Sequence, residues 1–380
     1  MGRSLFTGAV LFDGEAFLDG QAVLVEDGGV VALCPVSEAV AADTIIELNG
    51  GVLATGFIDV QVNGGGGVLF NKTPTADGVR AITNAHRSFG VTAMLPTLIT
   101  DTPEKIRTAA AAVKDAMATG CPGCLGIHLE GPFISPARKG AHKGDYIRMM
   151  GDADVEFLLG LDIDTVLVTV APDVVPPEQI RRLSDAGIIV SLGHSDATYD
   201  EVARAVDAGA RGVTHLFNAM SPLSHRAPGM VGAALEFGEL WCGIIADGHH
   251  VDAAALRVAL RAKRGPGRLF LVSDAMSTVG DAGDVFELNG RAVTRAGGRL
   301  TLADGTLAGS DLDMASAVRF AVRELGVPRA EALRMASLYP ATLLRKDDCY
   351  GRIRPGYRAD FVHLNDDDIV QSVWVVGEKS

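Results

Sequence analysis

The chain has 380 residues, 48% of them hydrophobic, and its 34 basic and 47 acidic residues give a net charge of -13. That charge argues against a nucleic-acid-binding or anionic-membrane surface, although a few local donors can still hold one phosphate group. The length suits a barrel of about 250 residues with a smaller module. The N-terminal residues form no long apolar segment, and no run reaches about 20 apolar residues, so we expect a cytoplasmic protein.

The N-terminal region alternates short β-rich runs with Asp-Gly and Asn-Gly turns, which predicts a small antiparallel sheet. Two more strands are predicted near the C-terminus, at 359–364 and 369–376. Neither end carries enough apolar area to fold alone. We therefore expect residues 1–54 and 346–380 to pack together as one discontinuous β-sandwich domain beside a central domain, 55–345.

Between these ends, apolar strands alternate with helical patterns. The predicted strands are 57–62, 92–98, 124–129, 165–170, 188–192, 212–215, 243–246 and 269–272. Helices are predicted between most of them, at 76–89, 103–117, 177–186, 199–208 and 253–263. Eight βα repeats over about 220 residues predict an α/β fold, a (β/α)8 TIM-type barrel with its active site at the C-terminal ends of the strands. A doubly wound open sheet is the alternative.

Two glycine-rich segments interrupt this pattern. Residues 284–307, after the eighth strand, predict a β excursion or lid before a helix at 312–325. Residues 64–67 lack the lysine of a phosphate loop and the spaced glycines of a dinucleotide site, so a tight turn is expected.

The five cysteines are scattered and odd in number, which argues against a disulfide framework. Cys121 and Cys124 form the one close pair, but they lie in a turn before a strand, whereas a redox pair normally opens a helix after one. We expect reduced thiols.

Three predicted strands carry metal-binding side chains to their C-terminal ends. Glu130 ends the third strand just before a Gly-Pro pair, and His194 and His215 follow two later strands. Each of these alone is more often a hydrogen-bonded strand-end residue. One carboxylate and two imidazoles at the same end of a barrel, however, suit a borderline divalent metal such as Zn²⁺, with a position left for water.

Characteristic phrases span nearly the whole chain, at 57–64, 95–98, 126–133, 139–142, 193–199, 214–220, 228–232, 245–251, 272–274, 307–310 and 356–360. In these phrases and their order, the chain resembles the N-acetylglucosamine-6-phosphate deacetylases of the amidohydrolase superfamily. The resemblance implies hydrolysis of N-acetyl-D-glucosamine 6-phosphate to D-glucosamine 6-phosphate and acetate, a step of amino-sugar catabolism and recycling.

Glu130, His194 and His215 match the metal ligands of that family. Many amidohydrolases place a His-x-His pair at the end of strand one for a second metal, but this chain has Gln61 and Asn63 there. Amides are weak ligands, and strand four also lacks the lysine that bridges two metals in other branches. We therefore expect one divalent ion per chain, Zn²⁺ first, with Fe²⁺, Co²⁺ or Mn²⁺ as alternatives, and both amides as hydrogen-bonding neighbours.

Asp274 matches the catalytic carboxylate of the family at the end of strand eight. It is expected to take a proton from the metal-bound water as general base and to return it to the leaving amine as general acid. A helix N-cap is the structural alternative for this residue. By the same resemblance, His250 polarises the acetamide carbonyl, although the adjacent His249 leaves two candidates.

The resemblance also places the sugar and phosphate contacts. They are Gln61, Ala141, His142, Asn218, Ala219, Arg226, His250, Leu307, Ala308 and Gly309. Backbone N–H groups and an arginine fork are suited to binding phosphate. Family members often form dimers in which the partner contributes to the phosphate pocket, so a homodimer is expected. His128 is expected to be structural.

Two other functions stay open on the sequence. The first is another amidohydrolase that acts on a cyclic amide or a different N-acyl sugar, and Arg226 with the 216–220 loop argues against it. The second is a non-catalytic family member with an assembly or regulatory role. The intact metal ligands and Asp274 argue against that role, because a scaffold needs none of them.

Overall fold

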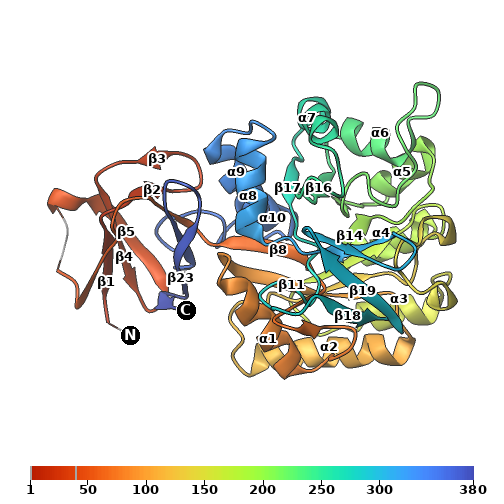
Figure 1. The fold of residues 1–380 in the computed structure, drawn as a ribbon, viewed down its shortest axis with the longest axis horizontal. Helices are drawn as coiled ribbons and strands as arrows, with labels where there is room; N and C mark the ends of the chain where they lie inside the picture. The colour runs from red at the N-terminus through yellow and green to blue at the C-terminus, as the bar shows by residue number, and fades with distance from the viewer. Residues whose placement is uncertain (1, 39–40) are drawn as a thin grey trace.

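The computed structural model describes residues 2–38 and 41–380. It consists of a β module that holds both chain termini and a larger α/β barrel (Figure 1). None of the helices in the described part of the chain is long and apolar enough to span a membrane.

Two sheets form the β module. The first has the order β5-β4-β1-β6 and contains β1 (Ser4–Thr7), β4 (Gln21–Glu26), β5 (Gly29–Pro35) and β6 (Thr44–Glu47). The second has the order β24-β23-β22-β7-β2-β3 and contains β2 (Val10–Phe12), β3 (Phe17–Leu18), β7 (Val52–Thr55), β22 (Phe361–Leu364), β23 (Val370–Val375) and β24 (Glu378–Lys379). Because β22 pairs with β7, the C-terminal strands complete a sheet that the N-terminal strands begin.

The two sheets share an aromatic core. The ring of Phe6 lies 5.2 Å from those of Phe361 and Trp374, edge to face in both pairs. The predicted packing of both ends into one module is therefore observed, and the domain boundaries at 54 and 345 stay a prediction. The expected antiparallel arrangement is only partly correct, because β1 pairs with β6, and β2 with β7, in parallel. Side-chain alternation reports the faces of a strand but not its partner.

The barrel is an eight-stranded parallel sheet in which consecutive strands are neighbours. Its strands are β8 (Phe57–Val62), β11 (Val91–Ile99), β12 (Ile127–Glu130), β13 (Val166–Val170), β14 (Ile189–Leu192), β15 (Gly212–Val213), β16 (Trp241–Ile244) and β17 (Leu269–Leu271). Val62 and Ala275 form a parallel bridge, and the N–H of Asp274 donates to the carbonyl of Gln61 at 3.0 Å. These contacts join the last strand to the first, so the predicted TIM-type barrel is confirmed and the open sheet is excluded.

Helices surround the barrel where amphipathic patterns predicted them. These are α1 (Ala76–Arg87), α2 (Pro103–Ala118), α4 (Pro177–Asp185), α5 (Tyr199–Asp207), α7 (Ala253–Ala262) and α8 (Met314–Arg323). Thr75, Thr102, Thr198, Asp252 and Asp313 cap five of them by accepting a backbone N–H at the first turn. Such caps each stabilise a helix by about 1 kcal/mol.

The remaining helices gave weaker sequence signals. They are α3 (Asp152–Leu159), α6 (Gly229–Glu236), α9 (Arg329–Ala336) and α10 (Leu338–Leu343). Nearly every residue of α6 is buried, so it lacks the polar face on which a helical period depends. Short 3-10 turns occur at Val36–Glu38, Pro136–Arg138 and Gly144–Tyr146. All five cysteines are free, as expected.

The excursion after β17 is a four-stranded antiparallel sheet, which we call the lid sheet. It contains β18 (Val285–Leu288), β19 (Arg291–Ala296), β20 (Arg299–Thr301) and β21 (Leu307–Ser310). β18 and β19 lie across the front of the barrel in Figure 1. Leu288, Val293 and Leu300 pack in one apolar cluster with Leu69 and Ile99 of the barrel mouth. The predicted lid is therefore observed in contact with the C-terminal ends of the strands.

The glycine segment beside the lid sheet forms a small hairpin. β9 (Gly64–Gly65) and β10 (Val68–Leu69) pair around Gly66 and Gly67, which have φ of 60° and 79°. Both angles are in the region that glycine tolerates best, and the predicted tight turn is confirmed.

Asp59 on β8 is a fully buried carboxylate inside the barrel. Its Oδ1 accepts the backbone N–H groups of Gln61 at 3.2 Å and Ser273 at 3.3 Å, while Oδ2 has no hydrogen-bond partner. Burial raises the pKa of Asp59 to about 7. The folded protein therefore holds this proton to a higher pH than the unfolded chain does.

We predict that Asp59→Asn stabilises the fold more at pH 8 than at pH 5. The raised pKa means that wild-type stability is lost as the pH rises from about 4 to about 7, and asparagine removes that loss. Urea unfolding of both proteins at the two pH values measures how far the free energy of unfolding of the variant exceeds that of wild type. This excess should grow by up to about 1.4 kcal/mol for each pH unit between the two pKa values. An excess that is equal at pH 5 and pH 8 would contradict the raised pKa of Asp59.

Candidate metal centre and active site

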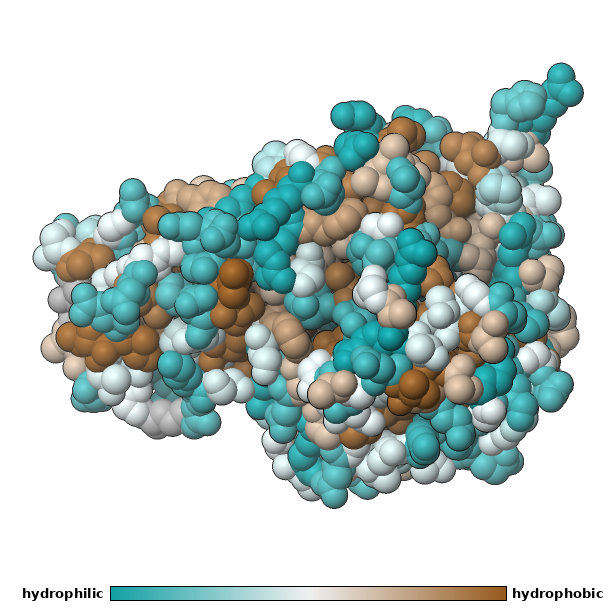
Figure 2. All heavy atoms as spheres, in the orientation of Figure 1, coloured by the Kyte–Doolittle hydropathy of each residue, from teal (hydrophilic) through white to brown (hydrophobic). Residues whose placement is uncertain are grey.

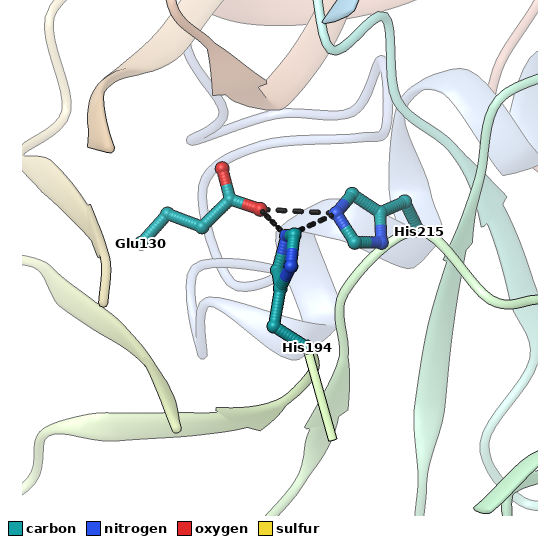
Figure 3. Close-up of side chains that lie close together, drawn as sticks. All are labelled: Glu130, His194 and His215. Carbon is teal, nitrogen blue, oxygen red and sulfur yellow. Dashed lines mark hydrogen bonds and ion pairs between the residues drawn. The ribbon is translucent and has the colours of Figure 1, made fainter. Parts of the chain in front are cut away.

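Glu130, His194 and His215 meet at the C-terminal mouth of the barrel (Figure 3). Glu130 ends β12, and the two histidines follow β14 and β15. Oε1 of Glu130 lies 3.1 Å from Nε2 of His194 and 3.0 Å from Nε2 of His215, and the two Nε2 atoms are 3.1 Å apart. All three side chains are buried. The sequence prediction that these residues converge is therefore correct.

Each histidine adopts an unusual backbone conformation. The φ angles are 48° at His194 and 31° at His215, in a region that costs most non-glycine residues energy. In both cases the chain turns sharply after a short strand. The turn brings the imidazole back over the end of the barrel.

The hydrogen bonds around His194 show that the cluster suits a cation. Nδ1 of His194 donates to the carbonyl of Arg138 at 2.9 Å, so the hydrogen of a neutral ring is on Nδ1. The Nε2 lone pair then faces the carboxylate oxygen of Glu130, and two acceptors face each other. A divalent ion held by the two imidazoles and the carboxylate resolves this conflict.

Electrostatics keep the carboxylate of this cluster ionised. Burial by itself raises the pKa of Glu130, but the imidazoles of His194 and His215 outweigh it and hold that pKa well below its ordinary value. For His215, burial lowers the pKa, but the contact with Glu130 outweighs it and the net shift is upward. The three residues thus combine a buried negative charge with two imidazole nitrogens that can bind a metal ion.

Asp274 lies next to this cluster, after β17, with a φ of 53°. Its Oδ1 accepts hydrogen bonds from Nε2 of Gln61 at 3.1 Å and Nδ2 of Asn63 at 2.7 Å. The same Gln61 nitrogen lies 3.2 Å from Oε1 of Glu130. Burial and the charge of Glu130 raise the pKa of Asp274 to about 6. One oxygen of Asp274 is thus anchored by amides, which leaves Oδ2 for chemistry.

A cavity of about 240 Å³ opens beside these residues. Besides the metal-binding cluster, it is lined by most of the predicted site residues, namely Ala141, His142, Asn218, Ala219, His250, Asp274, Leu307 and Gly309. The sequence reasoning did not assign Ile99, Gly140, Ile245, Met276, Leu288 and Thr306, which also line it. Most of these are apolar, and an apolar residue gives no chemical signal in a sequence, even where it lies inside a characteristic phrase, as Gly140 and Ile245 do.

Three predicted contact residues do not line this cavity. Gln61 lies beneath it, between Glu130 and Asp274. Ala308 is fully buried in the apolar cluster of the lid sheet. Leu307 and Gly309 face the cavity, so strand alternation turns Ala308 to the opposite face of β21.

Arg226 is the third exception. It is exposed on the loop between β15 and α6, which extends beyond the barrel in Figure 1 and has a hydrophilic tip in Figure 2. Arg226 lines a separate groove together with Asp196 and Tyr199. No lysine or arginine of the described residues lines the cavity beside the metal cluster.

The structure distinguishes between the neighbouring histidines 249 and 250. His250 lines the cavity, and its Nδ1 lies 2.6 Å from Oδ2 of Asp247. His249 points to the lid sheet, where its Nδ1 accepts from Nε of Arg299 at 3.1 Å. The register of the motif therefore selected the residue that faces the cavity.

Two other histidines are buried nearby. His142 lines the cavity, and its Nδ1 lies 2.7 Å from Oγ1 of Thr100. Burial, with the nearby His194, holds the pKa of His142 well below its ordinary value, so the ring is neutral. His128 is enclosed in the barrel between the Val60 carbonyl and the Thr169 hydroxyl, and burial lowers its pKa to about 4. His128 is thus placed as a structural residue.

The sequence and the fold are both similar to known proteins. The chain matches the amidohydrolase family over residues 52–379. It is 44% identical to an N-acetylgalactosamine-6-phosphate deacetylase of Shewanella sp. (strain ANA-3), over 94% of this chain and 91% of that protein. It is 40% identical to the N-acetylglucosamine-6-phosphate deacetylase of Homo sapiens, over 89% of this chain and 85% of that protein.

The crystal structure of N-acetylglucosamine-6-phosphate deacetylase from Pasteurella multocida has the same fold. It superposes with a TM-score of 0.96 and 35% sequence identity, covering 100% of this chain and 99% of that chain.

Proposed function

This chain belongs to the amidohydrolase family, and we propose that it hydrolyses N-acetyl-D-glucosamine 6-phosphate to D-glucosamine 6-phosphate and acetate. The observation that carries this proposal is the buried Asp274 carboxylate beside the Glu130, His194 and His215 cluster, in a cavity of about 240 Å³. Such a cavity holds a small polar molecule, and its residues suit hydrolysis of an amide.

One divalent ion would be held by Glu130, His194 and His215, with Zn²⁺ as the first choice and Fe²⁺, Co²⁺ or Mn²⁺ as alternatives. When bound, the ion supplies a Lewis acid and lowers the pKa of a coordinated water. Gln61 and Asn63 donate to the neighbouring carboxylates and, as neutral amides, add no strong ligand for a second ion.

Asp274 carries the proton in this mechanism. Its pKa of about 6 leaves it ionised at neutral pH, and it is still basic enough to take a proton from the attacking water. It then returns this proton to the leaving amine. The two amides on Oδ1 keep the carboxylate in place while Oδ2 exchanges the proton. His250 lines the same cavity and donates to the developing oxyanion.

A cation strengthens the binding of a phosphate group, and the described lining residues of one chain's cavity include no lysine or arginine. Arg226 is exposed on the loop between β15 and α6, which also carries the exposed side chain of Leu223. We infer a homodimer in which Arg226 of a second copy reaches the phosphate, while backbone N–H groups near Ala219 and Leu307 complete the contact. We also propose a cytoplasmic location, because the proposed substrate is a soluble phosphorylated sugar.

N-acetyl-D-galactosamine 6-phosphate is the second candidate substrate. The 44% identical relative from Shewanella favours it. Acetate release from each sugar phosphate, measured with and without a chelator, tests the proposal and ranks the two epimers. Activity on neither sugar would contradict the proposed function.

We predict that Asp274→Asn lowers kcat by about 100-fold or more, the scale of a lost general acid and base. Metal content should be unchanged, because Asp274 is not among the proposed ligands. Steady-state kinetics with elemental analysis of the same samples provide the measurement. A kcat within a few-fold of the wild-type value would refute the proton transfer.

Metal analysis tests the ligand set. After dialysis we expect about one divalent ion per chain, because the cluster offers three strong ligands and the amides offer none. His194→Ala or His215→Ala should lose the ion, and Gln61→Ala should retain it. Two tightly bound ions per active chain would show that another residue, first His142 or His128, belongs to the metal site.

We predict that Arg226→Ala raises KM for the phosphorylated sugar far more than for the unphosphorylated one, because only the former loses a charge-assisted bond of roughly 1.5 to 3 kcal/mol.

Mixing Arg226→Ala with Asp274→Asn chains tests whether Arg226 acts in its own chain or in the site of the partner chain. At substrate concentrations well below the KM of Arg226→Ala, random exchange between dimers should restore about a quarter of the wild-type activity if Arg226 acts across the interface. Mass spectrometry shows whether mixed dimers have formed. If they have formed and no activity returns, Arg226 does not act across the interface.

A further inference from the structure

The loop that follows β16 is organised around one carboxylate that the proposed mechanism does not use. Oδ1 of Asp247 accepts the backbone N–H groups of His249 at 2.8 Å and His250 at 2.9 Å. Oδ2 of Asp247 lies 2.6 Å from Nδ1 of His250. The side chains of Asp247 and His250 are each 7% exposed. The backbone and the ring of His250 are therefore both held by Asp247.

The ionised state of Asp247 determines which ring nitrogen is left for the substrate. Burial raises the pKa of Asp247, but His250 and the two backbone N–H groups outweigh burial and hold that pKa below its ordinary value. A carboxylate has no hydrogen to give, so Nδ1 of His250 carries the hydrogen of this bond. The ring then presents Nε2 to the cavity that it lines.

We propose that Asp247 is a positioning residue for the deacetylation, which fixes the ring orientation and hydrogen placement of His250 so that Nε2 meets the acetamide group. This proposal rests on the proposed function. Asp247 itself does not line the cavity, so it acts through His250. When both ring nitrogens carry hydrogen, the carboxylate of Asp247 accepts from Nδ1, and Nε2 is left to donate a charge-assisted hydrogen bond to an oxyanion.

The substitution Asp247→Asn distinguishes the proposed positioning of the His250 ring from simple support of the loop backbone. Asp247 uses one oxygen for the backbone and the other for the ring. Asparagine has the same shape but only one acceptor oxygen. If that oxygen caps the backbone, the NH2 group faces Nδ1 and moves the ring hydrogen to Nε2. The backbone of the loop is then still held, but the hydrogen bond between residue 247 and Nδ1 of His250 is reversed, with Nδ1 as the acceptor.

The test compares wild type, Asp247→Asn, His250→Ala and the double variant as metal-loaded enzymes acting on N-acetyl-D-glucosamine 6-phosphate. We expect Asp247→Asn to lower kcat by about 10-fold to 100-fold and to change KM by less than about threefold, because the interaction is made in the transition state. The double variant should be no slower than His250→Ala alone. A kcat for Asp247→Asn within about twofold of wild type, or losses that add in the double variant, would overturn the proposal.

Asp252 offers a matched control in the same loop. It caps α7 by accepting the N–H of Ala254 at 2.7 Å and does not line the cavity. Asp252→Asn makes the same chemical change, and asparagine caps helices about as well as aspartate. Its kcat should equal that of wild type. An equal loss in Asp252→Asn would show that the effect comes from loop charge and would also overturn the proposal.

Nitrogen NMR of the histidine rings gives a readout that does not depend on activity. The His250 signals are identified by their loss in His250→Ala, and one-bond couplings show which ring nitrogen carries hydrogen. We expect hydrogen on Nδ1 in wild type and a shift toward Nε2-only protonation in Asp247→Asn. An Nδ1 without hydrogen in wild type would overturn the proposal.

The failure of the proposed function can be told apart from the failure of this proposal. If wild type releases no acetate from either sugar, the proposed function fails, and the NMR measurement still decides whether Asp247 positions the ring.

Discussion

The buried carboxylate of Glu130 is the group on which the rest of the site depends. It sits at the end of β12, where two imidazoles and the amide of Gln61 all approach the same oxygen, Oε1. A carboxylate buried in this way is stable only if nearby donors or a cation balance its charge. The barrel supplies those partners because the C-terminal ends of its parallel strands meet at one mouth.

The amides of Gln61 and Asn63 connect Glu130 to Asp274 without adding charge. Both donate to the same oxygen of Asp274, and Gln61 also approaches Glu130. Burial, together with the charge of Glu130, raises the pKa of Asp274. The site thus contains one carboxylate whose pKa is held low and another whose pKa is raised, and the proposed mechanism uses the first for the ion and the second for the proton.

Elements outside the barrel close the cavity from two sides. The lid sheet packs its apolar face on the barrel mouth, and Arg291 of β19 donates to the carbonyl of Ala141 at the cavity wall. The loop after β16 contributes His250, whose ring is held by Asp247. By contrast, the loop that carries Arg226 extends away from the barrel, so the cavity of a single chain contains acids, imidazoles and amides but no strong cation among its described lining residues.

The sequence by itself determined the barrel, the module formed by both termini, the lid and the cluster of Glu130, His194 and His215. These follow from strand and helix periods and from chemically distinctive residues at strand ends, which are local properties of a chain. Only the tertiary structure decided that Ala308 packs in the lid core, that Arg226 lies outside its own cavity and that β1 and β6 pair in parallel. It also showed that Asp247 holds the ring of His250, the histidine that the motif register had already selected over His249. These outcomes depend on which face a side chain presents and on which distant segment packs against it, and a motif records neither.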